Sequence, residues 1–302
     1  GMDVAQQQPE QHNLVQQRLD FVAAEQALKQ NNPREFQRLV TKLAGYPLYP
    51  YLLYQELYPR LDKAPAAEVD GFLWAYADSP LAWRLYDAWL RTLADQGRWQ
   101  DFIDAYQPAK GEADNSGEMP CLYCRALLRT GNAADPFADL ETVWLTGQPL
   151  SAVCDSLFEA WRQAEGLSDG LVWQRLGLAI EAGQLDLARS LSRLLSPADQ
   201  LWAGWWLELR QRPERVKTLP AFNLQHPQLP DILAYGIKRL ALNDATGAVD
   251  VWQTLRATQP FTAAHITAVN RSLALALAAQ NDPQASVWLG ALDSNEEDQR
   301  VR

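Results

Sequence analysis

The chain has 302 residues, of which 47% are hydrophobic and 21% are charged, and its formal net charge is −10. This composition is that of a folded protein with a substantial core and excludes a disordered chain. The acidic balance gives no support for a nucleic-acid surface, which needs a basic stripe, or for electrostatic binding to anionic lipid. No apolar run approaches the roughly 20 residues of a membrane-spanning helix.

Apolar residues recur at helical spacing from residue 14 onward. The first such segment starts at Leu14 and stops at the polar breaker of residues 30–33, which then begins a second helix ending at Gly45. Residues 1–13 precede the pattern and are expected to form a disordered or weakly ordered tail. Residues 14–302 are expected to form one α-superhelical domain.

The same unit, a helix followed by a short polar turn and a second helix, returns along the chain. Each turn contains a Gly or Asn, which is expected to supply the left-handed residue that ends a helix. These residues are Asn31, Gly97, Gly131, Gly183, Asn243 and Asn281. Their spacing is irregular, with 34 residues between Gly97 and Gly131 but 52 between Gly131 and Gly183. The sequence therefore predicts an all-α fold of irregular, stacked helical hairpins, similar to a tetratricopeptide solenoid.

Two segments interrupt this pattern. Residues 109–120 read as a surface excursion, and residues 212–230 carry four prolines and read as an irregular connection between hairpins. The twelve tryptophans are a high count. In helical repeats their favoured role is to fill wide gaps between helix pairs, with stacking on a ligand as the alternative.

Motifs of the common enzyme classes do not occur in the sequence. It contains no phosphate-binding loop, dinucleotide-binding glycine motif, zinc-protease motif or nucleophile elbow. Paired acids occur at Glu181 with Asp186 and at residues 296–298, where solvated positions are favoured over a cleft. His226 and His265 are expected to be loop or surface residues rather than bases. The residues alone indicate no catalytic site, no metal site and no cofactor.

Cys121 and Cys124 form a CxxC motif. A zinc site would need two further ligands at suitable spacing, and a redox motif normally follows a strand. Neither condition is met, so the sequence favours neither a zinc site nor a redox motif. With Cys154 as the third cysteine, the sequence leaves open either three thiols or one disulfide with one thiol left over.

An aromatic motif occupies residues 46–54. Pro50 fits the first turn of a new helix, where a missing N–H costs nothing, and Tyr51 and Tyr54 then lie one turn apart. The favoured interpretation is a rigid corner packed with aromatic side chains, and the alternative is an aromatic platform for a sugar or peptide. The motif residues are Tyr46, Pro47, Tyr49, Pro50, Tyr51 and Tyr54.

Two stretches carry a resemblance to a known family. Residues 46–54 resemble the YPLYPYLEY segment of the soluble lytic murein transglycosylases. Residues 143–147, 154–158 and 161–162 resemble the LWLTG…CDKLF..WR stretch of the same family. Looser matches at residues 125–131 and 273–292 extend the resemblance from about residue 14 to the end.

The resemblance implies a fold and a function. In this family an α-superhelical region forms a ring, and a separate lysozyme-like domain cleaves the β-1,4 bond between N-acetylmuramic acid and N-acetylglucosamine to give 1,6-anhydromuramoyl products. Its catalytic glutamate lies in a Glu-Ser context, followed by GLMQ and AYNAG-type motifs, and none of these strings occurs here. The expectation is a partial ring that ends before the linker and catalytic domains.

The expected role is therefore a non-catalytic periplasmic scaffold in a Gram-negative bacterium. It would position peptidoglycan glycan strands through the inner face of the ring, or dock other cell-wall proteins. The alternative is a stand-alone scaffold for protein–protein contacts in the tetratricopeptide style.

The resemblance also implies a pairing of the cysteines. Cys121 and Cys154 match a disulfide pair of the family, and they lie 33 positions apart. Closing a loop of this length stabilises a fold by about 3–4 kcal/mol in the chain-entropy account. Cys124 has no counterpart in the family pattern and is expected to be the odd thiol, buried beside the disulfide.

Overall fold

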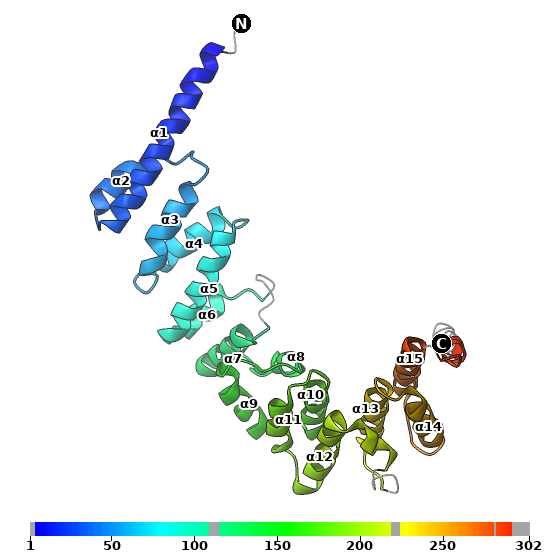
Figure 1. Ribbon diagram of the computed structural model, residues 1–302. Coiled ribbons are helices and arrows are strands. Elements are labelled where there is room, and N and C mark those ends of the chain that lie inside the picture. The colour runs from blue at the N-terminus through cyan, green and yellow to red at the C-terminus, as the bar shows by residue number, and fades with distance from the viewer. Residues whose placement is uncertain (1–3, 109–114, 219–223, 281, 292–302) are drawn as a thin grey trace. The chain divides into compact units, whose positions relative to one another are not determined.

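The computed structural model describes residues 4–108, 115–218, 224–280 and 282–291, and the regular elements among them are all helices (Figure 1). This confirms the predicted all-α class. The structure has two compact units. Unit 1 comprises Gly1–Asp114 and Met119–Pro136, and unit 2 comprises Asn115–Glu118 and Phe137–Arg302. None of the described helices combines the length and the apolar character needed to cross a membrane.

Unit 1 is built from sequence-adjacent helices that pack on one another, α1 against α2 and α3, and α5 against α4 and α6. Its elements are α1 (Val4–Lys29), α2 (Pro33–Thr41), α3 (Tyr49–Leu57), the 3-10 helix η1 (Tyr58–Arg60), α4 (Ala66–Ala75), α5 (Pro80–Asp95), α6 (Trp99–Ala105) and nearly all of α7 (Glu118–Thr130). The α1 helix begins at Val4, within the segment 1–13 expected as an N-terminal tail, and residues 1–3 lie outside the described residues.

The core between α1, α2 and α3 is apolar. Leu43 and Leu52 are fully buried, and Phe36 is nearly so. Asn32 caps α2, since its side chain accepts a hydrogen bond from the backbone N–H of Glu35, and Pro33 occupies the first turn. The polar breaker predicted at residues 30–33 is therefore the junction between two packed helices.

Unit 2 continues the same arrangement. The α10 helix packs on α11 and α12, and α13 packs on α12, α14 and α15, so that consecutive helices lie side by side (Figure 1). Its elements are α8 (Leu140–Trp144), α9 (Val153–Gln163), α10 (Asp169–Glu181), α11 (Leu185–Ser192), α12 (Pro197–Gln211), the 3-10 helix η2 (Pro213–Lys217), α13 (Leu229–Ala241), α14 (Ala245–Arg256) and α15 (Ala263–Ala279). Each helix buries its apolar face on its neighbours, as stacked hairpins do.

Glycine permits the closest helix contacts in unit 2. A Cβ atom at Gly177 of α10 would lie 2.7 Å from the Trp206 ring of α12, and one at Gly236 of α13 would lie 2.9 Å from Leu209 of α12. Both distances are shorter than side chains tolerate. These two positions therefore set how closely α12 approaches its neighbours.

The turns follow the predicted rule with one exception. Asn31, Gly97, Gly131 and Gly183 have φ values of 55°, 69°, 69° and 75°, which confirms their left-handed conformation. Asn243 is not among the positive-φ residues, so that prediction was wrong. The α13–α14 turn closes instead through the backbone bond from Asp244 N–H to Leu240 O (2.8 Å), and Asp244 then caps α14.

The remaining predicted irregular segments are described only in part. Asn281 lies outside the described residues, as do residues 109–114 of the predicted surface excursion and residues 219–223 of the proline-rich connection. The connection contains η2, whose Val216 is fully buried.

Candidate functional site

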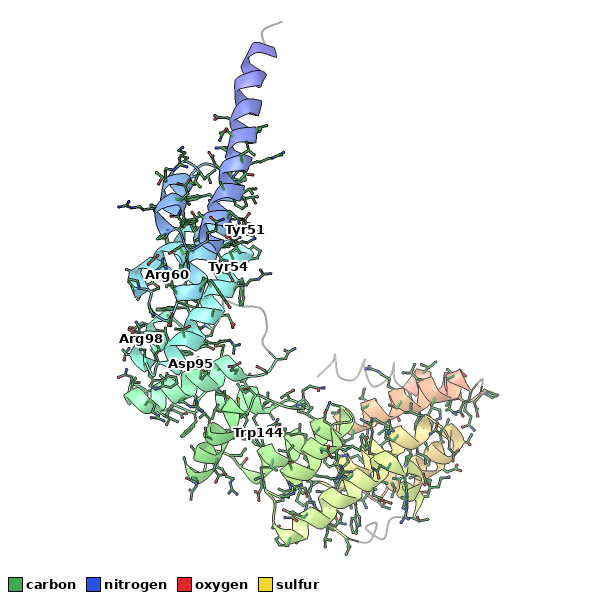
Figure 2. All side chains as sticks on the ribbon, turned by 60° about the vertical axis from the view of Figure 1, so that its left-hand side comes forward. Tyr51, Tyr54, Arg60, Asp95, Arg98 and Trp144 are labelled. Atoms are coloured by element: carbon green, nitrogen blue, oxygen red, sulfur yellow. The ribbon has the colours of Figure 1, made fainter. Side chains whose placement is uncertain are left out.

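The aromatic motif of residues 46–54 forms the junction into α3, with Pro50 in its first turn as predicted. Tyr46 and Tyr49 pack against the core of α1, α2 and α3. Tyr51 is 46% exposed, whereas Tyr54 is partly buried, with ring centroids 5.2 Å from Tyr58. Burial, followed by the charge of Tyr58, raises the pKa of Tyr54. Figure 2 labels both tyrosines on α3. These contacts are of the kind that a packed corner makes.

The cysteines lie in buried positions. Cys121 and Cys154 are disulfide-bonded and 0% exposed. Cys124 is 2% exposed on α7 and takes no part in a disulfide.

Both predicted surface histidines pair with an aspartate. His226 precedes α13, and its Nε2 lies 2.8 Å from Asp199 Oδ1. His265 lies in the first turn of α15, 2.5 Å from Asp231, and completes the capping box of that helix. The two rings line one open pocket of about 660 Å³. The Nδ1 atom of each ring accepts a backbone N–H, from Gln228 and Thr262 respectively. Each histidine thus joins two parts of the chain.

The predicted acid pairs are solvated where the structure describes them. Asp186 forms a 2.9 Å ion pair with Arg189, and Glu181 lies 3.7 Å from Lys238. Both acids are exposed, at 104% and 54% of their side-chain surface. Residues 296–298 lie outside the described part of the chain.

The second family-like stretch builds the strongest candidate site. Trp144 ends α8, and its Nε1–H donates to the Leu171 carbonyl oxygen of α10 at 2.8 Å. Its ring packs edge-on against Phe158 of α9, with centroids 4.9 Å apart. A Cβ atom at Gly147 would collide with the Leu178 carbonyl oxygen. The tryptophan and the glycine of this stretch therefore hold the α8–α9 connection tightly against α10.

A buried arginine lies on the Trp144 ring. Arg175 of α10 is 4% exposed, and its guanidinium carbon lies 4.6 Å from the Trp144 centroid and 5.8 Å from that of Phe158. Its Nη2 donates to the Gln148 carbonyl oxygen at 3.3 Å, and its Nε has no hydrogen-bond partner.

The electrostatic state of Arg175 follows from this burial. Desolvation lowers the pKa of Arg175 to about 10, and the negative charge of Asp155 opposes the shift. The side chain therefore stays protonated at neutral pH. Among the described carboxylates none forms an ion pair with it. A buried cation without an anion is an unusual arrangement, since buried charges are normally paired.

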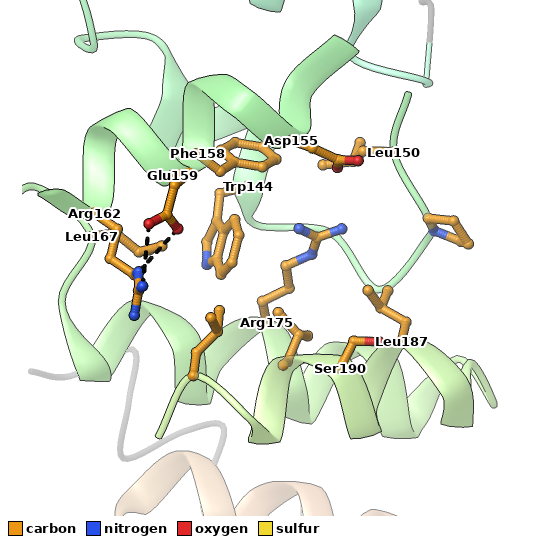
Figure 3. Close-up of a pocket in the computed structure, with 13 residues that line it drawn as sticks. Trp144, Leu150, Asp155, Phe158, Glu159, Arg162, Leu167, Arg175, Leu187 and Ser190 are labelled. Carbon is orange, nitrogen blue, oxygen red and sulfur yellow. Dashed lines mark hydrogen bonds and ion pairs between the residues drawn. The ribbon is translucent and has the colours of Figure 1, made fainter. Parts of the chain in front are cut away.

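Arg175 lines a pocket of about 360 Å³ formed by α8, α9, α10 and α11 (Figure 3). Trp144, Phe158, Leu167 and Leu191 form its buried apolar floor. Exposed polar side chains form its rim, and these are Asp155, Glu159, Arg162 and Ser190. Glu159 and Arg162 pair with each other at 3.2 Å. With a cation inside and an acidic group at the rim, the arrangement suits binding of a small polar ligand.

Sequence reasoning missed Arg175 and this pocket. The available signal was an arginine inside the apolar run of α10, flanked by the buried Leu176 and close to the buried Trp173. Among the described residues no group of three His, Cys, Asp or Glu side chains could hold a metal ion.

Known proteins resemble this chain over most of its length. A crystal structure of lytic transglycosylase Slt from Pseudomonas aeruginosa, an inactive E503Q mutant, superposes on 91% of this chain with a TM-score of 0.79 and 32% identity, and the match covers 44% of that protein. The soluble lytic murein transglycosylase of Escherichia coli K12 is 31% identical over 208 residues, and that of Salmonella typhimurium is 30% identical over 205. The chain is homologous to a part of the soluble lytic murein transglycosylases.

These relatives are longer than the chain. The matched residues make up 68% of this chain but 31% of the Escherichia coli protein. Structures of the 70 kDa Escherichia coli transglycosylase, one of them in complex with bulgecin A, share the fold at 24% identity with TM-scores of 0.71 and 0.72. The resemblance inferred from residues 46–54 and 143–162 is confirmed.

A family model of the cucumovirus coat protein also matches residues 129–226. This is about a third of the chain, and the superposition on the Pseudomonas structure covers 91% of it, so most of the segment belongs to the transglycosylase-like fold. Acidic side chains outnumber basic ones in the segment, which does not favour nucleic-acid packaging. The coat-protein match carries no functional argument.

Proposed function

We propose that this chain is the non-catalytic superhelical part of a periplasmic lytic transglycosylase and that it positions murein glycan strands, or partner proteins, for a catalytic domain. The observation that carries the proposal is the superposition on 91% of this chain and only 44% of the Pseudomonas protein. The disulfide supports an oxidising compartment such as the periplasm. The parent enzyme would cleave the β-1,4 bond between N-acetylmuramic acid and N-acetylglucosamine to give 1,6-anhydromuropeptides.

The described surface offers aromatic groups on which sugar rings stack. Trp74 of α4 is 86% exposed, and Tyr51 of the aromatic motif is 46% exposed. Aromatic rings bind the apolar faces of sugars at little entropic cost, because they have few rotatable bonds. Both residues belong to unit 1. We expect this unit to contribute to glycan binding.

The experiment is sedimentation of the purified chain with insoluble murein sacculi. The wild-type chain is expected to bind and to release no anhydromuropeptides. Trp74→Ala is expected to reduce binding several-fold. Leu242→Ala, which removes an exposed aliphatic group (67%) from unit 2, is expected to leave binding unchanged. Release of anhydromuropeptides by the chain alone would disprove the non-catalytic role. Failure of the wild-type chain to sediment would favour the stand-alone protein–protein scaffold instead.

A further inference from the structure

The pocket around Arg175 presents two charges of opposite sign to one cavity. The guanidinium projects from α10 into the pocket toward Asp155, which stands on the rim (Figure 3). Glu159, the other acid of the rim, is paired with Arg162. The inner cation and the rim acid Asp155 are therefore the two groups left for a ligand.

The hydrogen-bonding state of Arg175 indicates an anionic ligand. Arg175 is only 4% exposed, and its Nε donor has no hydrogen-bond partner. A guanidinium has five N–H donors in a planar fork that matches a carboxylate. A carboxylate in the pocket would meet the guanidinium and neutralise the buried charge.

The apolar floor defines the rest of the ligand. The floor residues Trp144, Phe158, Leu167 and Leu191 line the pocket together with Arg175 and favour an aliphatic body. The volume of about 360 Å³ lies at the lower end of the range, about 300–1,000 Å³, found for small-molecule pockets. This volume suits an amino acid or a dipeptide.

We propose that this pocket binds a small aliphatic zwitterion, of the size of an amino acid or dipeptide, with its carboxylate on Arg175 and its ammonium group toward Asp155. Binding neutralises both charges of the pocket, because the ligand carboxylate pairs with Arg175 and the ligand ammonium group pairs with Asp155. The proposal is independent of glycan binding, because it concerns unit 2 and a ligand without sugar.

The test uses the full 302-residue chain and three dipeptide ligands in calorimetric titrations. Alanyl-leucine is the zwitterion, alanyl-leucine amide lacks the anion, and N-acetyl-alanyl-leucine lacks the cation. We expect alanyl-leucine to bind at least tenfold more tightly than the amide and several-fold more tightly than the N-acetyl form. Equal affinity for the amide, or no binding of any of the three, would overturn the proposal.

Substitutions in the pocket test which side chain recognises the carboxylate of the ligand and which recognises its ammonium group. Arg175→Met is expected to abolish the preference for a free carboxylate, and Arg175→Lys to weaken binding while keeping that preference. Asp155→Asn is expected to remove the preference for a free amine without affecting the N-acetyl form. Arg189→Gln is the matched control, because it removes an exposed arginine of α11 that does not line the pocket. It should bind like the wild type.

A spectroscopic readout locates the ligand. The indole N–H signal of Trp144, assigned as the resonance missing from Trp144→Phe, is expected to shift on titration with alanyl-leucine in the wild type and not in Arg175→Met. If alanyl-leucine binds Arg175→Met as tightly as the wild type, or if the Trp144 signal stays unchanged at saturation, the ligand lies elsewhere and the assignment fails.

Discussion

The guanidinium of Arg175 lies 4.6 Å from the centre of the Trp144 ring, and both side chains are buried. The ring supplies the negative face of its quadrupole to a cation that has no carboxylate partner, an interaction that reaches about 2 kcal/mol when desolvated. Trp144 itself is fixed by the bond from its Nε1–H to Leu171 O (2.8 Å). One tryptophan thus joins α8, α9 and α10.

Substitution of Trp144 by a smaller side chain should destabilise unit 2, and the loss should be larger for alanine than for phenylalanine. Trp144→Phe keeps an aromatic ring but leaves the Leu171 carbonyl without its donor, which should cost about 1–3 kcal/mol. Trp144→Ala should cost about 3–5 kcal/mol, because it also opens a cavity beside Phe158. The two units need not unfold in one step, so hydrogen exchange of the α9 and α10 amides gives the local free energy.

Trp74→Ala is the control for these variants. Its side chain is 86% exposed, and surface substitutions stay within about 0.5 kcal/mol. An effect of Trp144→Ala no larger than that of Trp74→Ala would contradict the structural role of Trp144.

Two helical glycines should respond in opposite directions to alanine. Gly177→Ala places a Cβ atom 2.7 Å from the Trp206 ring and should lower the stability of unit 2 by about 1–2 kcal/mol, because overpacking outweighs the gain in helix propensity. Gly204→Ala on α12 meets nothing within 4 Å and should raise stability by about 0.5–1 kcal/mol. Urea midpoints of the two variants test this, and a shift of the same sign in both would refute the packing argument.

The ion pairs of Arg60 predict a pH dependence in unit 1. Arg60, labelled in Figure 2, pairs with Glu56 at 2.7 Å and also with Glu68 of α4. The hydrogen bond from Arg60 lowers the pKa of Glu68 from its ordinary value of 4.5. A lowered folded-state pKa contributes stability that is present above the unfolded value and is lost as the pH falls through the folded value. This contribution should therefore be complete well above pH 4.5 and be lost progressively as the pH falls below 4.5 and through the lowered folded-state pKa of Glu68.

Glu68→Gln isolates the contribution of this pair. Because Glu68 is 41% exposed, the wild type should exceed the variant by only about 0.5–1 kcal/mol at neutral pH. Urea unfolding across the acidic range should show the difference disappear at low pH. Asp186→Asn, which breaks an ion pair on a fully exposed carboxylate (104%), should differ little from the wild type at any pH. A Glu68→Gln deficit that persists at low pH would refute the assignment.

Local sequence signals predicted the repeated helices and most of their turns. Pro50 and Asn31 occupy the helix start and the left-handed turn that their chemistry favours. Asn243 shows where the rule fails, because the polar turn there closes through Asp244 N–H and the Asp244 cap instead. Both solutions satisfy the same backbone groups, and the local sequence does not choose between them.

The candidate site depended on contacts that sequence spacing does not reveal. The stretch around Trp144 was recognised as distinctive, yet its partner Arg175 lies 31 residues further along the chain, on a helix whose pattern reads as ordinary core. Only the packing of α8 and α9 on α10 brings them together. Burial of an unpaired cation is a property of that packing rather than of any local motif.

The last prediction concerns the disulfide. Cys121 and Cys154 are both disulfide-bonded and fully buried, whereas Cys124 is buried outside the bond. We expect non-reducing digestion to yield one covalent peptide pair containing Cys121 and Cys154, and Cys124 to react with alkylating reagents only after denaturation. Reduction should lower the free energy of unfolding by about 3–4 kcal/mol, because the reduced chain regains the loop entropy of the unfolded state.

Substitution of single cysteines shows which two of the three form the disulfide. Cys124→Ala should keep the linked peptide pair and the full loss of stability on reduction, while Cys154→Ala should abolish both the pair and the redox dependence. Since Cys121 and Cys124 are only three residues apart, the Cys124→Ala digest is the decisive measurement. Disappearance of the linked pair in that variant would show that Cys124, and not Cys121, forms the bond.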